Sequence, residues 1–104
     1  MFNFKTVFLL VVMLLFASAG SLAHTPLFSC WNNGEGGVTC EGGFSDGASA
    51  AGVKVYVKKE GEKINSGKMD KNSEFSFEEP EGEYTVIFDA GDGHKIKVKG
   101  SEIY

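Results

Sequence analysis

The chain has 104 residues, ten basic and fourteen acidic side chains, and a formal net charge of −4 at pH 7. Lysine and glutamate are interleaved along it, as on an ordinary solvated surface, and the acidic balance argues against binding to nucleic acid or anionic lipid. The length leaves room for one small domain.

Residues 1–23 have the three parts of a secretory signal peptide. Lys5 precedes an apolar run over residues 6–19, which is short for a membrane span. Small residues precede two candidate cleavage points, one after Ala23 and an alternative after Ala19. We therefore predict a periplasmic or secreted protein in which residues 24–104 form a single domain. No later stretch is apolar enough to cross a membrane, and removing Lys5 leaves nine lysines against fourteen acids, a formal charge of −5.

Cys30 and Cys40 are placed symmetrically about an Asn-Gly turn that is rich in glycine. This arrangement predicts a β-hairpin, and in an oxidising compartment it predicts a disulfide across that hairpin. Closing a loop of this size stabilises the fold by about 3 kcal/mol. Two alternatives are less favoured. Acylation of Cys30 in a lipoprotein would leave Cys40 unpaired, and a redox pair would have Cys-x-x-Cys spacing.

Apolar residues recur with a period of two after the hairpin, which is typical of strands with one buried face. Val53, Val55 and Val57 begin the pattern, and it returns over residues 74–78, 84–88 and 95–99, with turn residues between the runs. The pattern predicts an all-β fold, a small antiparallel β-sandwich of six to seven strands. We expect the alternating lysines of the last run to form a charged outer face that discourages edge pairing, rather than a basic binding stripe: Lys95, Lys97 and Lys99.

The segments over residues 67–77 and 80–86 resemble carboxypeptidase-regulatory-like domains, which are transthyretin-like sandwiches. The matching positions are Asp70, Phe75, Phe77, Gly82, Tyr84 and Val86. Met69 stands where threonine is usual and Ser73 where glycine is usual. Asn72 could take the left-handed conformation in place of that glycine. The resemblance implies a transthyretin-like (prealbumin-like) fold.

Over nearly all of residues 24–104 the chain is also similar to small extracytoplasmic accessory components of energy-coupling-factor nickel and cobalt transporters. The similarity rests on His24 at the processed N-terminus, on the Gly-Gly-Phe-Ser-Asp-Gly run over residues 42–47, and on the Ala-Gly-Asp-Gly-His segment over residues 90–94. It implies a nickel-handling accessory protein whose partner is a membrane metal transporter.

His24 and His94 are the candidate metal ligands. The α-amine and the ring Nδ1 of an N-terminal His24 form a chelate that suits nickel or copper ions. His94 would complete a three-nitrogen site if the fold brings it close, and Asp92 would assist as an auxiliary ligand. Asp89 and Asp92 together lack the ligand spacing of a calcium loop.

The sequence contains no serine in a Gly-x-Ser-x-Gly elbow, and both thiols are predicted to be paired, so we expect no enzyme. We expect an exported non-catalytic binding module that handles a transition metal. His24 would be the main ligand of that metal. The alternative is a structural or protein-interaction module of the cell envelope that uses no metal. Trp31, Tyr56 and Tyr104 would then be its contact aromatics.

Overall fold

The structure is a computed structural model that describes residues 24–104. The predicted signal peptide, residues 1–23, lies outside the described residues. Within residues 24–104 no helix is long and apolar enough to span a membrane. The described chain forms seven strands and one 3₁₀ turn: β1 (Pro26–Asn32), β2 (Gly37–Phe44), β3 (Lys54–Lys59), β4 (Glu62–Lys68), β5 (Glu74–Glu78), β6 (Thr85–Asp89), β7 (Lys95–Lys99) and η1 (Gly100–Glu102).

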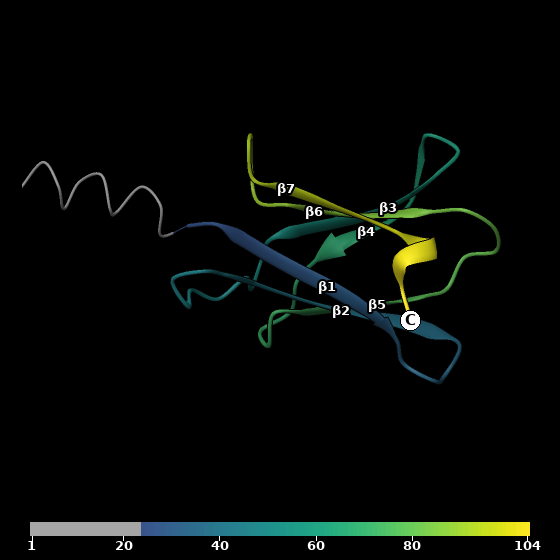
Figure 1. Ribbon diagram of the computed structural model, residues 1–104, viewed down its shortest axis with the longest axis horizontal. Helices are drawn as coiled ribbons and strands as arrows, with labels where there is room; N and C mark the ends of the chain where they lie inside the picture. The colour runs from purple at the N-terminus through teal and green to yellow at the C-terminus, as the bar shows by residue number, and fades with distance from the viewer. Residues whose placement is uncertain (1–23) are drawn as a thin grey trace, which may run out of the picture.

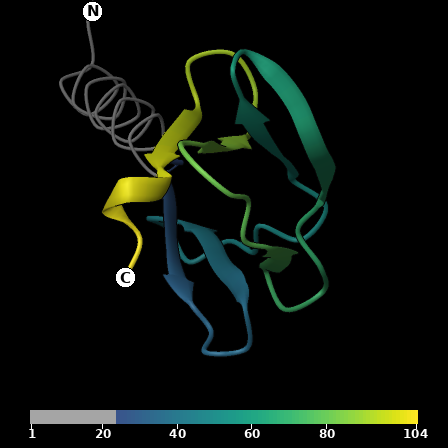
Figure 2. The same cartoon turned by 90° about the vertical axis from the view of Figure 1, so that its right-hand side faces the viewer.

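The strands form two antiparallel sheets. The smaller sheet has the order β1-β2-β5, and the larger has the order β4-β3-β6-β7. The two sheets lie against each other as the layers of a sandwich (Figures 1 and 2). The prediction of a small all-β antiparallel sandwich is therefore confirmed.

The period-two pattern of the sequence produces the two layers. Along β3, Val55 and Val57 are fully buried, whereas Lys54, Tyr56 and Lys58 point to the other face of the sheet. Burying one such apolar side chain contributes roughly 1.5–3 kcal/mol. Both sheets supply other fully buried core residues, and the β2–β3 connection adds Ala50: Val38, Cys40, Val86 and Phe88 come from the strands.

Phe88 joins the two sheets. Its ring, from β6 of the larger sheet, stacks on Phe28 of β1 with ring centroids 4.9 Å apart, and it contacts Phe44 of β2 at 6.3 Å. Gly42 makes this approach possible, because a Cβ atom at that position would come within 2.7 Å of Cε2 of Phe88. The aromatic contacts therefore depend on a glycine in the middle of β2.

The β4–β5 turn differs in one detail from the prediction. Ser73, and not Asn72, takes the left-handed conformation, with φ of 60°. The Ser73 hydroxyl oxygen accepts a hydrogen bond from the Ala50 amide at 3.0 Å and lies 3.1 Å from the Ser49 hydroxyl. Asp70 accepts bonds from the amides of Asn72 and Glu74. These bonds hold the serine at the position where the resembling domains have glycine.

Antiparallel pairing sorts the connections between two ends of the sandwich. The start of β1 and the β2–β3, β4–β5 and β6–β7 connections lie at one end, and the other connections and the C-terminal tail lie toward the opposite end (Figure 1). The tail is fixed by a hydrogen bond of 2.6 Å from the Asn32 amide to the Tyr104 carbonyl. We call the end that contains the start of β1 the N-terminal end of the sandwich.

Candidate functional site

His24 precedes β1 at the N-terminal end of the sandwich and lies beside the β2–β3 loop. Thr25 fixes this position, because its amide donates to the Ser45 hydroxyl at 3.2 Å and its carbonyl accepts from the Ser45 amide at 2.9 Å. Nδ1 of His24 lies 3.0 Å from Oδ2 of Asp46. The other oxygen of that carboxylate accepts from the Ala48 amide at 3.0 Å. The loop therefore orients the carboxylate toward the imidazole.

Asp46 is a functional candidate that the sequence analysis did not single out, since it appeared there only within the run over residues 42–47. The signal was nevertheless present. Cys30 lies opposite Cys40, and Pro26 opposite Phe44. The same register, continued by two residues, places position 24 opposite position 46. The predicted hairpin thus contained the His24–Asp46 pair.

His94 lies in the β6–β7 turn, where its amide donates to the Gly91 carbonyl and its carbonyl accepts from the Ala90 amide. Its ring Nδ1 lies 3.0 Å from the main-chain carbonyl oxygen of Asp92. Asp92 therefore contacts the imidazole through its backbone and not through its carboxylate. Asp89, in turn, accepts from the Gly91 amide and lies 3.9 Å from Lys95 Nζ.

The two histidines occur at the same end of the sandwich, because the start of β1 and the β6–β7 turn both lie there (Figure 1). Residues 24–104 contain no cluster of three or more His, Cys, Asp or Glu side chains positioned to hold a metal ion. The pair that the structure does bring together is His24 with Asp46, an imidazole nitrogen and a carboxylate oxygen. The side chain of His24 is 68% exposed, so a further ligand from solvent has access.

Cys30 and Cys40 form the predicted disulfide. They face each other directly across β1 and β2, with Cα atoms 4.0 Å apart. Cys30 is therefore not free for acylation, which contradicts the lipoprotein alternative. Both thiols are also unavailable as nucleophiles or metal ligands.

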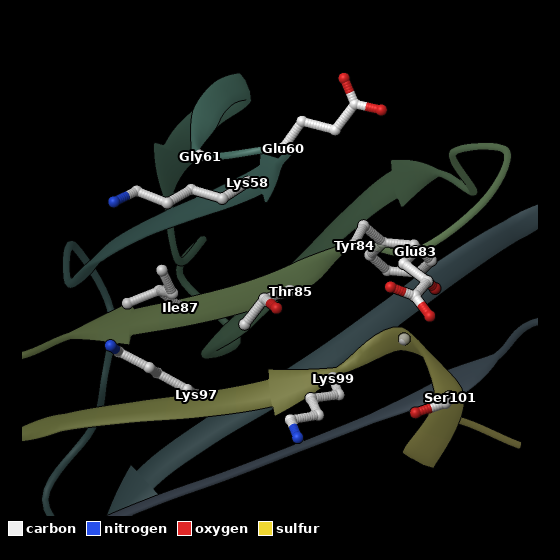
Figure 3. A pocket seen from close by; sticks show the side chains of 11 residues that line it. Lys58, Glu60, Gly61, Glu83, Tyr84, Thr85, Ile87, Lys97, Lys99 and Ser101 are labelled. Carbon is white, nitrogen blue, oxygen red and sulfur yellow. The ribbon is translucent and has the colours of Figure 1, made fainter.

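The outer faces of the two sheets have opposite charge. Lysines cover the outer face of the β4-β3-β6-β7 sheet, while the outer face of the β1-β2-β5 sheet carries Glu41, Glu74 and Glu78. The lysines and glutamates that are interleaved along the sequence are thus largely separated between the two outer faces. An open hollow of about 560 Å³ lies on the lysine-covered face, lined in part by Lys58, Lys97 and Lys99 (Figure 3).

The three candidate contact aromatics have different surroundings. The Tyr56 ring is covered by Lys63, whose Nζ lies 4.2 Å from its centroid, and by Lys58 at 5.8 Å. Trp31 is 37% exposed on the outer side of β1. Tyr104 is 95% exposed at the C-terminus. Trp31 and Tyr104 are therefore open to a partner, whereas Tyr56 is partly occupied by lysine.

Comparisons of the chain with protein-family models, with curated proteins and with solved structures find no match. The resemblances to carboxypeptidase-regulatory-like domains and to nickel and cobalt transporter components therefore stay predictions.

Proposed function

We propose that the protein is an exported, non-catalytic binding module that captures a late transition-metal ion at its N-terminal end. The proposal rests on one observation, the 3.0 Å separation between Nδ1 of His24 and Oδ2 of Asp46. Two ligand atoms at this separation can bind one ion side by side, and imidazole nitrogen is a preferred ligand of nickel and copper. The ion would be cargo that the module buffers or presents to a membrane transporter.

Cleavage before His24 would add a third ligand. The new α-amine and Nδ1 of the same residue would chelate the ion, and Asp46 would supply an oxygen from the facing loop. Pro26 has no amide hydrogen, so ligation through successive backbone amides could not extend past Thr25. Export is supported by the disulfide, which is typical of oxidising compartments, and by the predicted signal peptide.

Calorimetric titration of nickel and of copper into the processed protein, with its N-terminal residue confirmed by mass, tests the proposal. We expect one-to-one binding that is lost in His24→Ala and weakened about tenfold or more in Asp46→Asn, the loss expected for an auxiliary ligand. His94→Ala is the matched control, because it removes the other imidazole of residues 24–104 from the same end of the sandwich. Unchanged affinity in His24→Ala would overturn the proposal.

A second candidate is a metal-free interaction module of the cell envelope. It is favoured by Leu27, which is 53% exposed on the same outer side of β1 as Trp31. Trp31 is the single tryptophan of the chain. A blue shift of its fluorescence when a purified envelope protein is added without metal, absent with Leu27→Ser, would favour this candidate.

A further inference from the structure

The outer face of the larger sheet concentrates the basic charge of the domain. Side chains alternate across each strand, and residues directly opposite one another in the register share a face. On this basis seven of the nine lysines of residues 24–104 lie on one side of one sheet. We call this surface the lysine face: Lys54, Lys58, Lys63, Lys68, Lys95, Lys97 and Lys99.

Little negative charge balances the lysine face. Asp89 is the acidic residue at an outward strand position there, opposite Lys54 and Lys95. Glu60 and Glu83 line the hollow on this face but belong to the connections at one end of it. The protein is acidic overall, yet one complete sheet face is basic. An interaction with an anion would be directed to that face.

Two pairs of lysines face one another across neighbouring strands of the larger sheet. Lys54 lies directly opposite Lys68, and Lys58 directly opposite Lys63. Like charges directly opposite one another repel and destabilise a sheet. Neither pair is needed for the core, because all four side chains point away from it. Unfavourable local choices of this kind are expected where a surface serves binding.

A short lane of uncharged side chains, Thr85 and Ile87, lies along β6 in the middle of the lysine face, and Asp89 ends it. Thr85 lies between Lys58 and Lys99 in the register, and Ile87 lies between Tyr56 and Lys97. Figure 3 shows Thr85 and Ile87 on β6 with Lys58 on one side and Lys97 and Lys99 on the other. With strands spaced about 4.8 Å apart, the lane between β3 and β7 is about 10 Å wide. It overlaps the 560 Å³ hollow, which Glu60 and Glu83 also line.

We propose that the lysine face binds a linear anionic polysaccharide that lies in this lane, along β6. The basic residues on both sides of a narrow neutral strip complement a single charged chain. A flat bilayer surface would extend beyond the strip, whereas a single chain fits between its two rows of lysines. This proposal is independent of metal binding at His24.

The side-chain chemistry favours a sugar chain over nucleic acid. Binding of single strands uses aromatic rings on which bases stack, but Tyr56 is covered by Lys63 and Ile87 is aliphatic. The sequence contains no arginine, so the paired hydrogen bonds of a guanidinium are absent from this face. Lysines act as point charges that suit spaced carboxylates or sulfates. Hydroxyl groups of Thr85 and Ser101 are available to sugar hydroxyls in the hollow.

Affinity measurements with polygalacturonate oligosaccharides test the proposal. We expect the disulfide-bonded protein to bind them with an affinity that falls as salt rises, and not to bind uncharged dextran. Lys58→Gln combined with Lys97→Gln should weaken binding about thirtyfold. The matched control is Lys59→Gln combined with Lys71→Gln, which removes the same charge from the two lysines outside the lysine face and should change affinity less than threefold. Thermal unfolding of all variants checks the fold.

Three results would overturn the proposal. The first is absence of binding, and the second is an equal loss in the two double variants, which would show general charge attraction. The third is tighter binding of phosphatidylglycerol vesicles or of oligo(dT) with the same dependence on Lys58 and Lys97. That result would assign the lysine face to a membrane or to nucleic acid instead.

Discussion

The two sheets of this small domain share one core but differ in what holds them and in what they present. The β1-β2-β5 sheet is closed by a disulfide and carries glutamates on its outer face. The β4-β3-β6-β7 sheet has no covalent link within residues 24–104 and carries the lysine face. The β1-β2-β5 sheet is therefore stabilised by a covalent link, whereas the β4-β3-β6-β7 sheet carries many like charges on its outer face. The formal net charge describes neither surface.

The difference indicates a division between stability and binding. The core side chains of both sheets meet at Phe88, so folding of one sheet depends on the other. The outward positions, in contrast, are free to vary because they do not enter the core. Stabilising elements and charged surfaces can then be distributed unequally between the sheets without changing the fold.

Replacing the residue that joins the sheets should have the largest effect. We expect Phe88→Ala to lower the free energy of unfolding by about 4 kcal/mol, because it removes a fully buried ring and leaves a cavity. Urea unfolding measures this, with Ile64→Ala as the control, since Ile64 is half exposed and should cost less than about 0.5 kcal/mol. A loss below 1 kcal/mol for Phe88→Ala would mean that the sheets do not depend on one another.

Removing the disulfide tests whether the smaller sheet needs its covalent link. Cys30→Ala with Cys40→Ala should lower the free energy of unfolding by about 3 kcal/mol. Alanine is chosen because Cys40 is fully buried and a serine hydroxyl there would lack partners. We expect hydrogen exchange to accelerate more in β1 and β2 than in β3 and β6. Equal acceleration in both sheets would contradict the comparison.

Tyr84 offers a smaller, pH-dependent test of the larger sheet. Its side chain is 6% exposed, and its hydroxyl has no hydrogen-bond partner among the described residues. Burial, together with the nearby charge of Glu79, raises the pKa of Tyr84 above 10.0. Tyr84→Phe should therefore be neutral or stabilise the protein by about 1 kcal/mol at pH 7, since it removes an unpaired buried group.

The sign of the alkaline effect follows from the raised pKa. The unfolded chain loses the Tyr84 proton from about pH 10, before the folded chain does. The folded protein should therefore lose stability as the pH rises above 10, until the higher folded pKa is passed. Tyr84→Phe should reduce this decline in urea unfolding at pH 9 to 11. An identical decline in both proteins would show that Tyr84 stays neutral or ionises equally in both states.

Much of the fold could be predicted because its signals are local. Alternating valines and phenylalanines, separated by glycine and aspartate turns, predict the strands, and the spacing of Cys30 and Cys40 predicts their disulfide. The left-handed residue of the β4–β5 turn is Ser73, one position later than the predicted Asn72. Its stabilisation comes from Ala50, which is distant in sequence from Ser73.

The sites were harder to predict because they depend on strand order. The lysine face arises only when β7 pairs with β6, and β6 with β3, and no local pattern encodes that order. The His24–Asp46 pair could have been found, since both residues belong to one hairpin register. His94 lies on a different hairpin, so the distance between the two histidines cannot be predicted from the sequence.

The smallest effect we predict distinguishes stability from binding most directly. Lys68→Glu replaces a like-charge pair by an opposite-charge pair across from Lys54, and should raise the free energy of unfolding by about 0.5 kcal/mol. Lys71→Glu, in the β4–β5 turn, makes the same change of charge outside the sheet and should have little effect. If the lysine face serves binding, Lys68→Glu should also weaken polygalacturonate binding more than Lys71→Glu does. A variant that is less stable than the wild type would show that the lysine pair does not oppose folding, and it would remove the reason for treating that arrangement as functional.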